Sequence, residues 1–316
     1  MPQLPHLPSI RQLEIFVAVA RLQSFSRAAE LLNTSQSALS QAVLQTEKLL
    51  GTKLFKRTKR DVKLAPAGEV LFSRAERILG DLETAVSETL FNADPGQGRV
   101  RIACLSLVAT RVLPEAIRIF RSRYPRASIL VRDDYNERVI EILKNGGADL
   151  AISGFDRPDP VIAFQPILEE SFYFICPLRH PLAKKKRVVW RDLAGIDFVG
   201  MPASSASRAA IDRARVDAGI FQDAIYQVGR MTSVVEIVAQ GGGISIVPAL
   251  ALIDPGLRRK VHSRLMTNPE VRRTLGVMRL RGAGLSATAE EFERILLETL
   301  GQKKLEQFPG IKILVG

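Results

Sequence analysis

The stretch SFSRAAELLNTSQSALSQAVLQ, which runs from Ser24 to Gln45, contains two short helical patterns joined by a polar turn. In the first pattern, small and apolar residues mark one stripe, at Ala28, Ala29 and Leu32. In the second, one face is formed by residues three or four positions apart, namely Leu39, Ala42, Val43 and Thr46. Ser35 suits the N-cap of the second helix, because its hydroxyl can accept a hydrogen bond from a free backbone N–H. The spacing predicts a helix-turn-helix.

The opposite face of the second helix is polar. Beyond the helix start at Ser35 and Gln36, it carries Ser37, Ser40, Gln41 and Gln45. A glutamine can bridge the two hydrogen-bonding sites of adenine, and a serine can reach a base edge or a phosphate. A helix that is apolar behind and polar in front can therefore lie in the major groove of DNA. Taken alone, the pattern fits equally well two packed helices with a solvated face.

A basic segment, GTKLFKRTKRDVKLA, follows from Gly51 to Ala65 and holds six lysines and arginines against one acid, Asp61. Two short apolar runs, Leu54-Phe55 and Val62–Leu64, predict a hairpin that bends near Lys59–Asp61. Such a wing beside the helix would place cations against DNA phosphates. We expect contacts from Lys53, Arg57 and Arg60, and either arginine can enter the adjacent minor groove.

An earlier helix completes this region. Ser9 and Gln12 have the spacing of a capping box, and an apolar face follows at Leu13, Phe16, Val17 and Ala20. Three helices and a wing predict a winged helix-turn-helix DNA-binding domain over residues 1–65.

The same residues resemble the N-terminal signature of LysR-type transcriptional regulators, almost continuously from Ile10 to Glu69. The shared motifs are RQL-x-x-F-V-A-V-A, SF-x-RAAE, SQ-x-ALS, LF-x-R-T and L-x-PAGE. The resemblance implies a homo-oligomeric, effector-responsive transcription factor, most often a tetramer built from two dimers, with RNA polymerase as a further candidate partner. Many members have proline where this chain has Ser37 and arginine where it has Gln41. The loss of that arginine removes a phosphate or guanine contact, so the DNA preference of relatives does not transfer.

Composition agrees with a polyanionic partner, since the 316 residues carry a net charge of +12 and the pI is near 10.0. The opening MPQLPHLPSI lacks the basic start and apolar core of a secretory signal. The longest apolar stretch, around Ile244 to Ile253, is far short of the roughly 18 residues that a membrane span needs. We therefore expect a cytoplasmic protein.

The sequence contains no catalytic or metal-binding pattern. Cys104 and Cys176 each lie in an apolar run and are expected to be buried structural thiols rather than redox switches. The three histidines are far apart and lack ligand spacing, at His6, His180 and His262. Neither a phosphate-binding glycine loop nor a nucleophile elbow is present. We expect no cofactor, no metal and no enzyme activity.

A long helical pattern begins at Pro66 and ends before the breaker Asp94-Pro95-Gly96. Its apolar stripe has little to pack against, because the winged domain is already complete. Pairing with the same helix of a second copy would cover it, and the resemblance implies such a dimer through residues 66–95. A two-fold dimer presents two recognition helices, so the operator should be an imperfect inverted repeat. The alternative is a helix that packs only on its own chain.

After Gly98 strands and helices alternate, which predicts α/β layers with a mainly parallel sheet. The strand candidates are Val100–Leu105, Ser128–Arg132, Asp149–Ser153, Phe172–Cys176, Asp197–Gly200, Ala224–Val228, Ile244–Pro248 and Thr274–Leu280. The resemblance implies a periplasmic-binding-protein-like effector domain over residues 96–306, followed by a tail at 307–316. Its two α/β subdomains would span about 96–163 with 267–306, and about 164–266. The chain would cross near Ala163–Pro166 and return near Val261–Thr267.

Ligands in such folds bind at the carboxyl ends of strands, where helix N-termini offer free N–H groups to an anion. The residues that meet this condition are Ser106, Leu107, Gly154, Phe155, Met201, Pro202, Ser204, Ser205, Thr232, Ser233 and Pro248. Each hydroxyl among them also suits a simple helix cap. If the ends converge, a small carboxylate or similar anion is the expected effector. Arg230 is a candidate counter-charge, and a surface role suits it equally.

Three functional hypotheses remain open at this point. The first is a ligand-modulated DNA-binding regulator. The second is a winged-helix regulator that senses an inorganic oxyanion, although the long α/β region does not fit the smaller β-rich domain of such proteins. The third is a solute-binding protein or enzyme of the same α/β class without a DNA function. The missing secretion signal and catalytic pattern count against the third.

Overall fold

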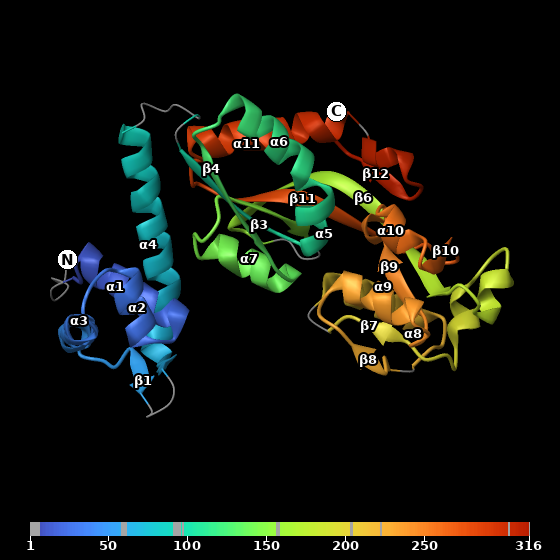
Figure 1. Ribbon diagram of the computed structural model, residues 1–316, viewed down its shortest axis with the longest axis horizontal. Coiled ribbons are helices and arrows are strands. Elements are labelled where there is room, and N and C mark those ends of the chain that lie inside the picture. The colour runs from blue at the N-terminus through green and yellow to red at the C-terminus, as the bar shows by residue number, and fades with distance from the viewer. Residues whose placement is uncertain are drawn as a thin grey trace. The chain divides into compact units, whose positions relative to one another are not determined.

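The computed structural model describes residues 7–57, 62–90, 96, 98–155, 159–202, 205–221, 223–302 and 304–315. The chain divides into a compact N-terminal unit that ends at Leu90 and a second unit that holds nearly all of the remaining residues (Figure 1). Within the described part of the chain, no helix is both long enough and apolar enough to cross a membrane.

The N-terminal unit is a winged helix-turn-helix with a long fourth helix, as predicted. Its elements are α1 (Ile10–Leu22), α2 (Phe25–Leu31), α3 (Gln36–Leu50), β1 (Phe55–Arg57), β2 (Val62–Leu64) and α4 (Pro66–Leu90). The predicted capping box begins α1, where the backbone N–H of Ser9 donates to Gln12 Oε1 at 2.9 Å and that of Gln12 donates to Ser9 Oγ at 3.2 Å. Ser35 caps α3, since its Oγ accepts from the Ala38 N–H at 3.1 Å.

The hairpin is held to the end of α3 by one buried carboxylate. Strands β1 and β2 pair antiparallel, with Phe55 opposite Leu64, and the predicted bend lies outside the described residues. Glu47, 4% exposed, accepts from the backbone N–H groups of Leu54 at 2.9 Å and Phe55 at 3.2 Å. Its second oxygen contacts Lys53 Nζ at 2.8 Å. The start of the wing is therefore fixed relative to α3.

Aromatic rings form the core of this unit. Phe16 is fully buried, and its ring centroid lies 5.4 Å from that of Phe55 and 6.5 Å from that of Phe72 on α4. Helix α4 contributes further to this core through Leu71, Ala75 and, near its middle, Leu79. The winged domain and the first half of α4 thus share one hydrophobic core.

The second unit alternates strands and helices. Its first part contains β3 (Arg99–Cys104), α5 (Ser106–Arg111), α6 (Leu113–Arg123), β4 (Ser128–Asp133), α7 (Asn136–Lys144), β5 (Leu150–Gly154) and β6 (Ile162–Pro177). Next come the short helices η1 (Pro181–Lys184) and η2 (Trp190–Leu193), then β7 (Val199–Gly200), α8 (Ala206–Asp217), β8 (Tyr226–Gln227), α9 (Met231–Ala239) and β9 (Ser245–Pro248). The last part contains η3 (Ala249–Leu252), α10 (Pro255–Arg258), β10 (Val261–Leu265), β11 (Arg272–Leu280), α11 (Ala287–Gly301), η4 (Lys304–Gln307) and β12 (Ile311–Ile313).

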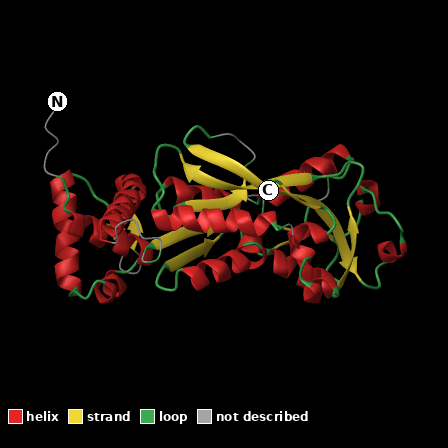
Figure 2. Cartoon of the chain, turned by 90° about the horizontal axis from the view of Figure 1, so that it is seen from above, coloured by secondary structure: helices red, strands yellow, loops and turns green. Residues whose placement is uncertain are grey.

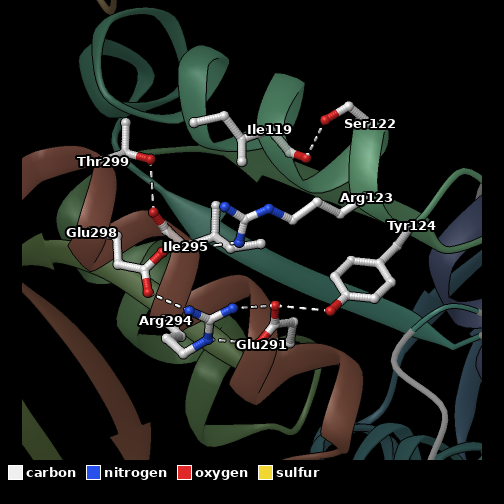
Figure 3. A network of polar contacts seen from close by, with 9 residues as sticks. All are labelled: Ile119, Ser122, Arg123, Tyr124, Glu291, Arg294, Ile295, Glu298 and Thr299. Atoms are coloured by element: carbon white, nitrogen blue, oxygen red, sulfur yellow. Dashed lines mark hydrogen bonds and ion pairs between the residues drawn. The ribbon is translucent and has the colours of Figure 1, made fainter.

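Helices cover both faces of the first part of the sheet (Figure 1). On β5, Leu150 and Ile152 belong to the core that includes α6 and α11, whereas Ala151 between them belongs to the core formed with α7. This alternation follows from the two-residue period of a strand. A polar network also joins the end of α6 to α11, because Oη of Tyr124, the residue after α6, donates to Glu291 Oε1 at 2.9 Å (Figure 3). Within α11, Arg294 pairs with Glu291 at 2.6 Å.

One long strand joins the two halves of the unit. The main sheet has the order β10-β6-β11-β5-β3-β4, with β9 and β12 also pairing with β6. Strand β6 pairs with β11 as far as Ser171 and with β9 and β10 from Phe172 onward. Figure 2 shows the strands of this unit in yellow among its red helices. The expected crossing at Ala163–Pro166 falls in the first half of β6, and the change of partners occurs several residues later.

The expectation of a mainly parallel sheet is wrong. Parallel pairing joins β3 to β4, β3 to β5 and β7 to β8, while β6 and β11 make antiparallel pairs with all their partners. The reason is topological, because the chain enters the second half along β6 and returns along β11, and adjacent outward and return strands run antiparallel. The residues of the expected C-terminal tail include β12, which pairs with β6.

Glu47 makes the stability of the N-terminal unit depend on pH. Burial opposes ionisation, but the hydrogen bonds from Lys53, Leu54 and Phe55 outweigh it and lower the pKa of Glu47 below its ordinary 4.5. The stabilisation is therefore complete above pH 4.5 and is lost as the pH falls through the folded-state pKa. We expect Glu47→Gln to lower the free energy of unfolding by about 1–3 kcal/mol at neutral pH.

Urea unfolding followed by circular dichroism at a series of pH values measures this effect. The difference between wild type and Glu47→Gln should shrink in acid. Glu14→Gln, which removes a carboxylate exposed on α1, is the matched control and should leave the curve unchanged. A pH-independent difference for Glu47→Gln would contradict the assignment.

Candidate functional site

The recognition helix α3 presents an exposed polar face, and residues at its start also hold the turn. Besides the Ser35 cap, Ser26 Oγ donates to Gln36 Oε1 at 3.3 Å, which ties α2 to α3. Ser37 Oγ lies 3.0 Å from Ser35 Oγ. Gln41 and Gln45 are exposed farther along the helix, whereas Ser40 is half-buried. Among the predicted contact residues, those at the helix start therefore also make hydrogen bonds within the turn, whereas Gln41 and Gln45 are exposed farther along the helix.

The structure describes some of the cations of the wing. Lys53 has an exposed side chain, yet its ammonium group is paired with the buried Glu47. Arg57 lies on β1, and Arg60 lies outside the described residues. Lys56 and Lys63 are exposed and lie opposite each other in the hairpin, so they form a pair of like charges available to phosphates. Neither lysine is among the predicted contact residues.

The second unit contains a cavity of about 480 Å³, including the open space at its mouth. Its lining combines backbone, hydroxyl and charged groups from both halves of the unit, namely Leu105, Ser106, Leu107, Asp134, Tyr135, Asn136, Met201, Ser205, Ser207, Gly229, Arg230, Met231 and Arg273.

The topology explains why the cavity lies at the end of β3. From β3 the chain moves to its neighbour β4, and it then returns to β5 on the other side of β3. Where the strand order reverses in this way, the flanking loops separate and leave a crevice at the carboxyl ends of the strands. Ser106 follows β3 and Asp134 follows β4, and both line the cavity.

The rim of the cavity carries an ion pair between its two sides. Arg230 Nη1 lies 3.3 Å from Asp133 Oδ2 and 3.4 Å from Ser106 Oγ. Hydrogen bonding from Ser106, together with Arg230, outweighs partial burial and lowers the pKa of Asp133. The Arg230 side chain is 65% exposed, so the pair is weak and Arg230 is accessible to a ligand.

A buried ion pair forms another part of the wall. Arg273, on β11, contacts Glu170 Oε1 through Nε at 2.8 Å and Nη2 at 2.6 Å. Its Nη1 donates to Ser207 Oγ of α8 at 2.6 Å. Glu170 is fully buried on β6, and its other oxygen accepts from the Leu250 N–H at 2.9 Å. The charge of Arg273 is therefore already compensated by Glu170. The hydrogen bonds of the pair hold together β6, β11, α8 and η3 around the cavity.

Five of the predicted effector residues line the cavity: Ser106, Leu107, Met201, Ser205 and, as the candidate counter-charge, Arg230. Others lie elsewhere. Thr232 and Ser233 follow Arg230 on α9, Pro202 and Pro248 lie outside the lining, and Ser204 is outside the described residues. Gly154 is the last residue of β5 and Phe155 follows it, with its ring stacked on that of Phe164 at 5.0 Å between centroids.

Sequence reasoning missed eight of the thirteen lining residues, four of them being Leu105, Ser207, Gly229 and Met231. Asp134, Tyr135 and Asn136 follow the strand Ser128–Asp133, and applying the same strand-end rule to that strand would have found them. No comparable local signal marks Arg273, because it meets Glu170 across 103 positions of the chain. The two sides of the cavity approach closely at Gly229, where an added Cβ would lie 2.1 Å from Tyr135 Oη.

Both cysteines are buried, as expected. Burial, with a smaller contribution from Asp133, raises the pKa of Cys104 to about 12, and burial raises the pKa of Cys176 to about 11. Neither thiol is poised to ionise near neutral pH. Across the described residues, no cluster of three or more histidine, cysteine or acidic side chains could hold a metal ion.

Two family models match this chain. Residues 10–69 match the bacterial regulatory helix-turn-helix protein of the lysR family, and residues 93–301 match the LysR substrate binding domain. The chain belongs to the LysR family. It is a transcriptional regulator with a DNA-binding helix-turn-helix domain and an effector-binding domain, which is the first of the three hypotheses.

Similar proteins match about two thirds or more of this chain. The HTH-type transcriptional regulator YfeR of Shigella flexneri is 34% identical over 89% of this chain and 91% of its own. A full-length OxyR variant from Pseudomonas aeruginosa has the same fold, with a TM-score of 0.69 at 20% identity over 93% of this chain and 95% of its own. The effector binding domain of QuiR in complex with shikimate has a TM-score of 0.60 at 22% identity and covers 66% of this chain and 99% of its own.

Removal of Arg273 should destabilise the effector domain strongly. Arg273→Met leaves the Glu170 carboxylate buried without its cation, which costs about 3–5 kcal/mol and corresponds to a fall in Tm of roughly 10 °C for a domain of this size. Differential scanning calorimetry measures the change.

Two further variants make this test specific. Arg272→Met removes the neighbouring arginine, whose partners Glu169 and Glu270 are near the surface, and should change Tm little. Adding Glu170→Leu to Arg273→Met should recover much of the loss, because no buried charge then remains. Equal effects of the two arginine variants would refute the role given to the pair.

Proposed function

We propose that this LysR regulator reads DNA with the exposed face of α3 and is anchored on the phosphates by its wing. The observation that supports the proposal is that α3 has one buried apolar face and one exposed polar face. Leu39 and Val43 are buried in the core of the winged domain, whereas Gln41 and Gln45 are exposed. Lys56 and Lys63 supply phosphate contacts beside the helix. Arg57 and Arg60 remain candidates for the same role, and Lys53 acts mainly by closing the wing onto α3.

The second half of α4 supports dimerisation. Its first half is covered by the winged core, but the apolar stripe continues at four-residue spacing through Ile78, Leu82 and Val86, which are 52%, 36% and 48% exposed. A repeated apolar stripe on a helix packs well against a copy of itself. The dimer would carry two recognition helices related by a two-fold axis, so the operator is an imperfect inverted repeat.

The complete regulator would be a tetramer of two such dimers that acts on cytoplasmic DNA, with RNA polymerase as a further partner. The effector would favour one arrangement of the dimers over another. For this to work, its affinity must differ between the two arrangements, since equal binding to both shifts nothing.

The cavity favours a small carboxylate as effector. Arg230 is the accessible cation at the mouth, and its contact with Asp133 is loose enough to be exchanged for a ligand carboxylate. The Ser106 hydroxyl adjoins the same guanidinium group and can hydrogen-bond to the same anion. The related QuiR domain binds shikimate, which is itself a carboxylate. Arg273 does not supply this charge, because Glu170 already neutralises it.

Calorimetric titration of the full-length protein with a panel of organic acids and their uncharged amides tests the effector proposal. An acid should bind and its amide should not. Arg230→Met should weaken the best acid roughly tenfold, and Ser106→Ala should weaken it several-fold. Thr232→Ala, two residues from Arg230 but outside the cavity, is the matched control and should bind normally. Unchanged affinity in both cavity variants would remove the assignment.

Disruption of the exposed stripe on α4 should separate the subunits. We expect Ile78→Asp with Val86→Asp to lower the mass measured by light scattering, because the pairing would bury charges without partners. Ile78→Leu with Val86→Leu keeps the stripe apolar and should keep the wild-type mass. An unchanged assembly in the aspartate variant, with the fold intact by circular dichroism, would exclude α4 as an interface.

A further inference from the structure

Before Lys48, the recognition helix exposes one large apolar side chain, that of Leu44, among small and uncharged polar ones. Its exposed residues before Lys48 are Gln36, Ser37, Ala38, Gln41, Leu44 and Gln45, and α3 is described along its whole length. Leu44 is 45% exposed, whereas Leu39 and Val43 are 0% and 1% exposed. The Leu44 side chain therefore lies outside the core, on the face proposed to meet DNA.

The position of Leu44 places it on the same side as the other contact residues but farther along the groove. It follows Gln41 by three residues and Ser37 by seven, and both spacings keep side chains on one face of a helix. At 1.5 Å per residue, Leu44 lies about 10 Å along the axis from Ser37, or roughly three base-pair steps of 3.4 Å. Leu44 and the helix start would therefore meet different base pairs.

The chemistry of this face matches A·T pairs. Guanine is best read by arginine or lysine and the cytosine amino group by a carboxylate, and neither kind of side chain is exposed on α3 before Lys48. Glutamine suits adenine, and the apolar group at the edge of the major groove is the 5-methyl of thymine. Among the exposed side chains of α3 before Lys48, that of Leu44 is the largest apolar group able to cover such a methyl.

We propose that Leu44 packs against the 5-methyl group of a thymine in each half-site, so that the regulator selects a T·A pair at that position. The inference rests on the proposed placement of α3 in the major groove and names the base that this part of the helix reads. Leu44 thereby contributes to sequence specificity, whereas Lys56 and Lys63 contribute to affinity for any duplex.

The test begins with the full-length protein and a pool of random duplexes, from which the preferred half-site is selected. Each thymine of the selected site is then replaced singly by deoxyuridine, which removes only the methyl group. One thymine per half-site should lose about fourfold in affinity, the effect of one buried methyl group. In Leu44→Ala the same replacement should have no further effect. At that position 5-methylcytosine should bind better than cytosine.

Matched variants separate this contact from other effects. Leu50→Ala removes another exposed leucine of α3 and should keep the response to deoxyuridine. Leu44→Gln, which keeps length but loses the apolar end, should abolish the response as Leu44→Ala does. A selected site that is insensitive to every deoxyuridine, or a response that persists in both Leu44 variants, would overturn the inference while leaving α3 in the groove. Failure to enrich any sequence would instead overturn the proposed DNA reading itself.

Discussion

The effector domain is organised around the buried pair between Glu170 and Arg273. A carboxylate with no solvent exposure is tolerated only when its hydrogen bonds and its charge are satisfied, and here Arg273 and the Leu250 N–H satisfy both oxygens. Because β6 runs through both halves of the domain and β11 runs beside it, the pair lies where the chain passes from one half to the other. The same arginine bonds Ser207 and lines the cavity, so the ion pair that fixes the crossing also shapes the ligand site.

The N-terminal unit likewise depends on one buried carboxylate, that of Glu47. Glu47 gathers two backbone N–H groups and a lysine, and it thereby sets the wing against the last turns of α3. In the proposed mode of DNA binding, α3 meets the bases and the wing meets the phosphates, and this carboxylate holds the two together. The apolar stripe of α4 is covered only in part. Leu71 and Ala75 pack in the core of the winged domain, whereas Ile78, Leu82 and Val86 are exposed.

Local signals in the sequence were sufficient for the helices and the wing. The capping box at Ser9, the N-cap at Ser35 and the two strands of the hairpin all depend on residues close to one another in the sequence. Strand positions followed from apolar runs, but strand direction did not, because the antiparallel pairing of β6 and β11 depends on how the chain returns. The cavity was found in part, since the strand-end rule located Ser106 and Ser205 but was not applied to the end of β4.

The amino-acid sequence by itself determined the DNA-binding architecture, the family and the α/β character of the remainder, because periodicity, capping and motif spacing are short-range properties. Only the tertiary structure decided which charges are already neutralised. Lys53 is held by Glu47 and Arg273 by Glu170, whereas Arg230 is left accessible. Those pairings join residues brought together by folding, and the strength of each depends on burial, which no short stretch of sequence specifies.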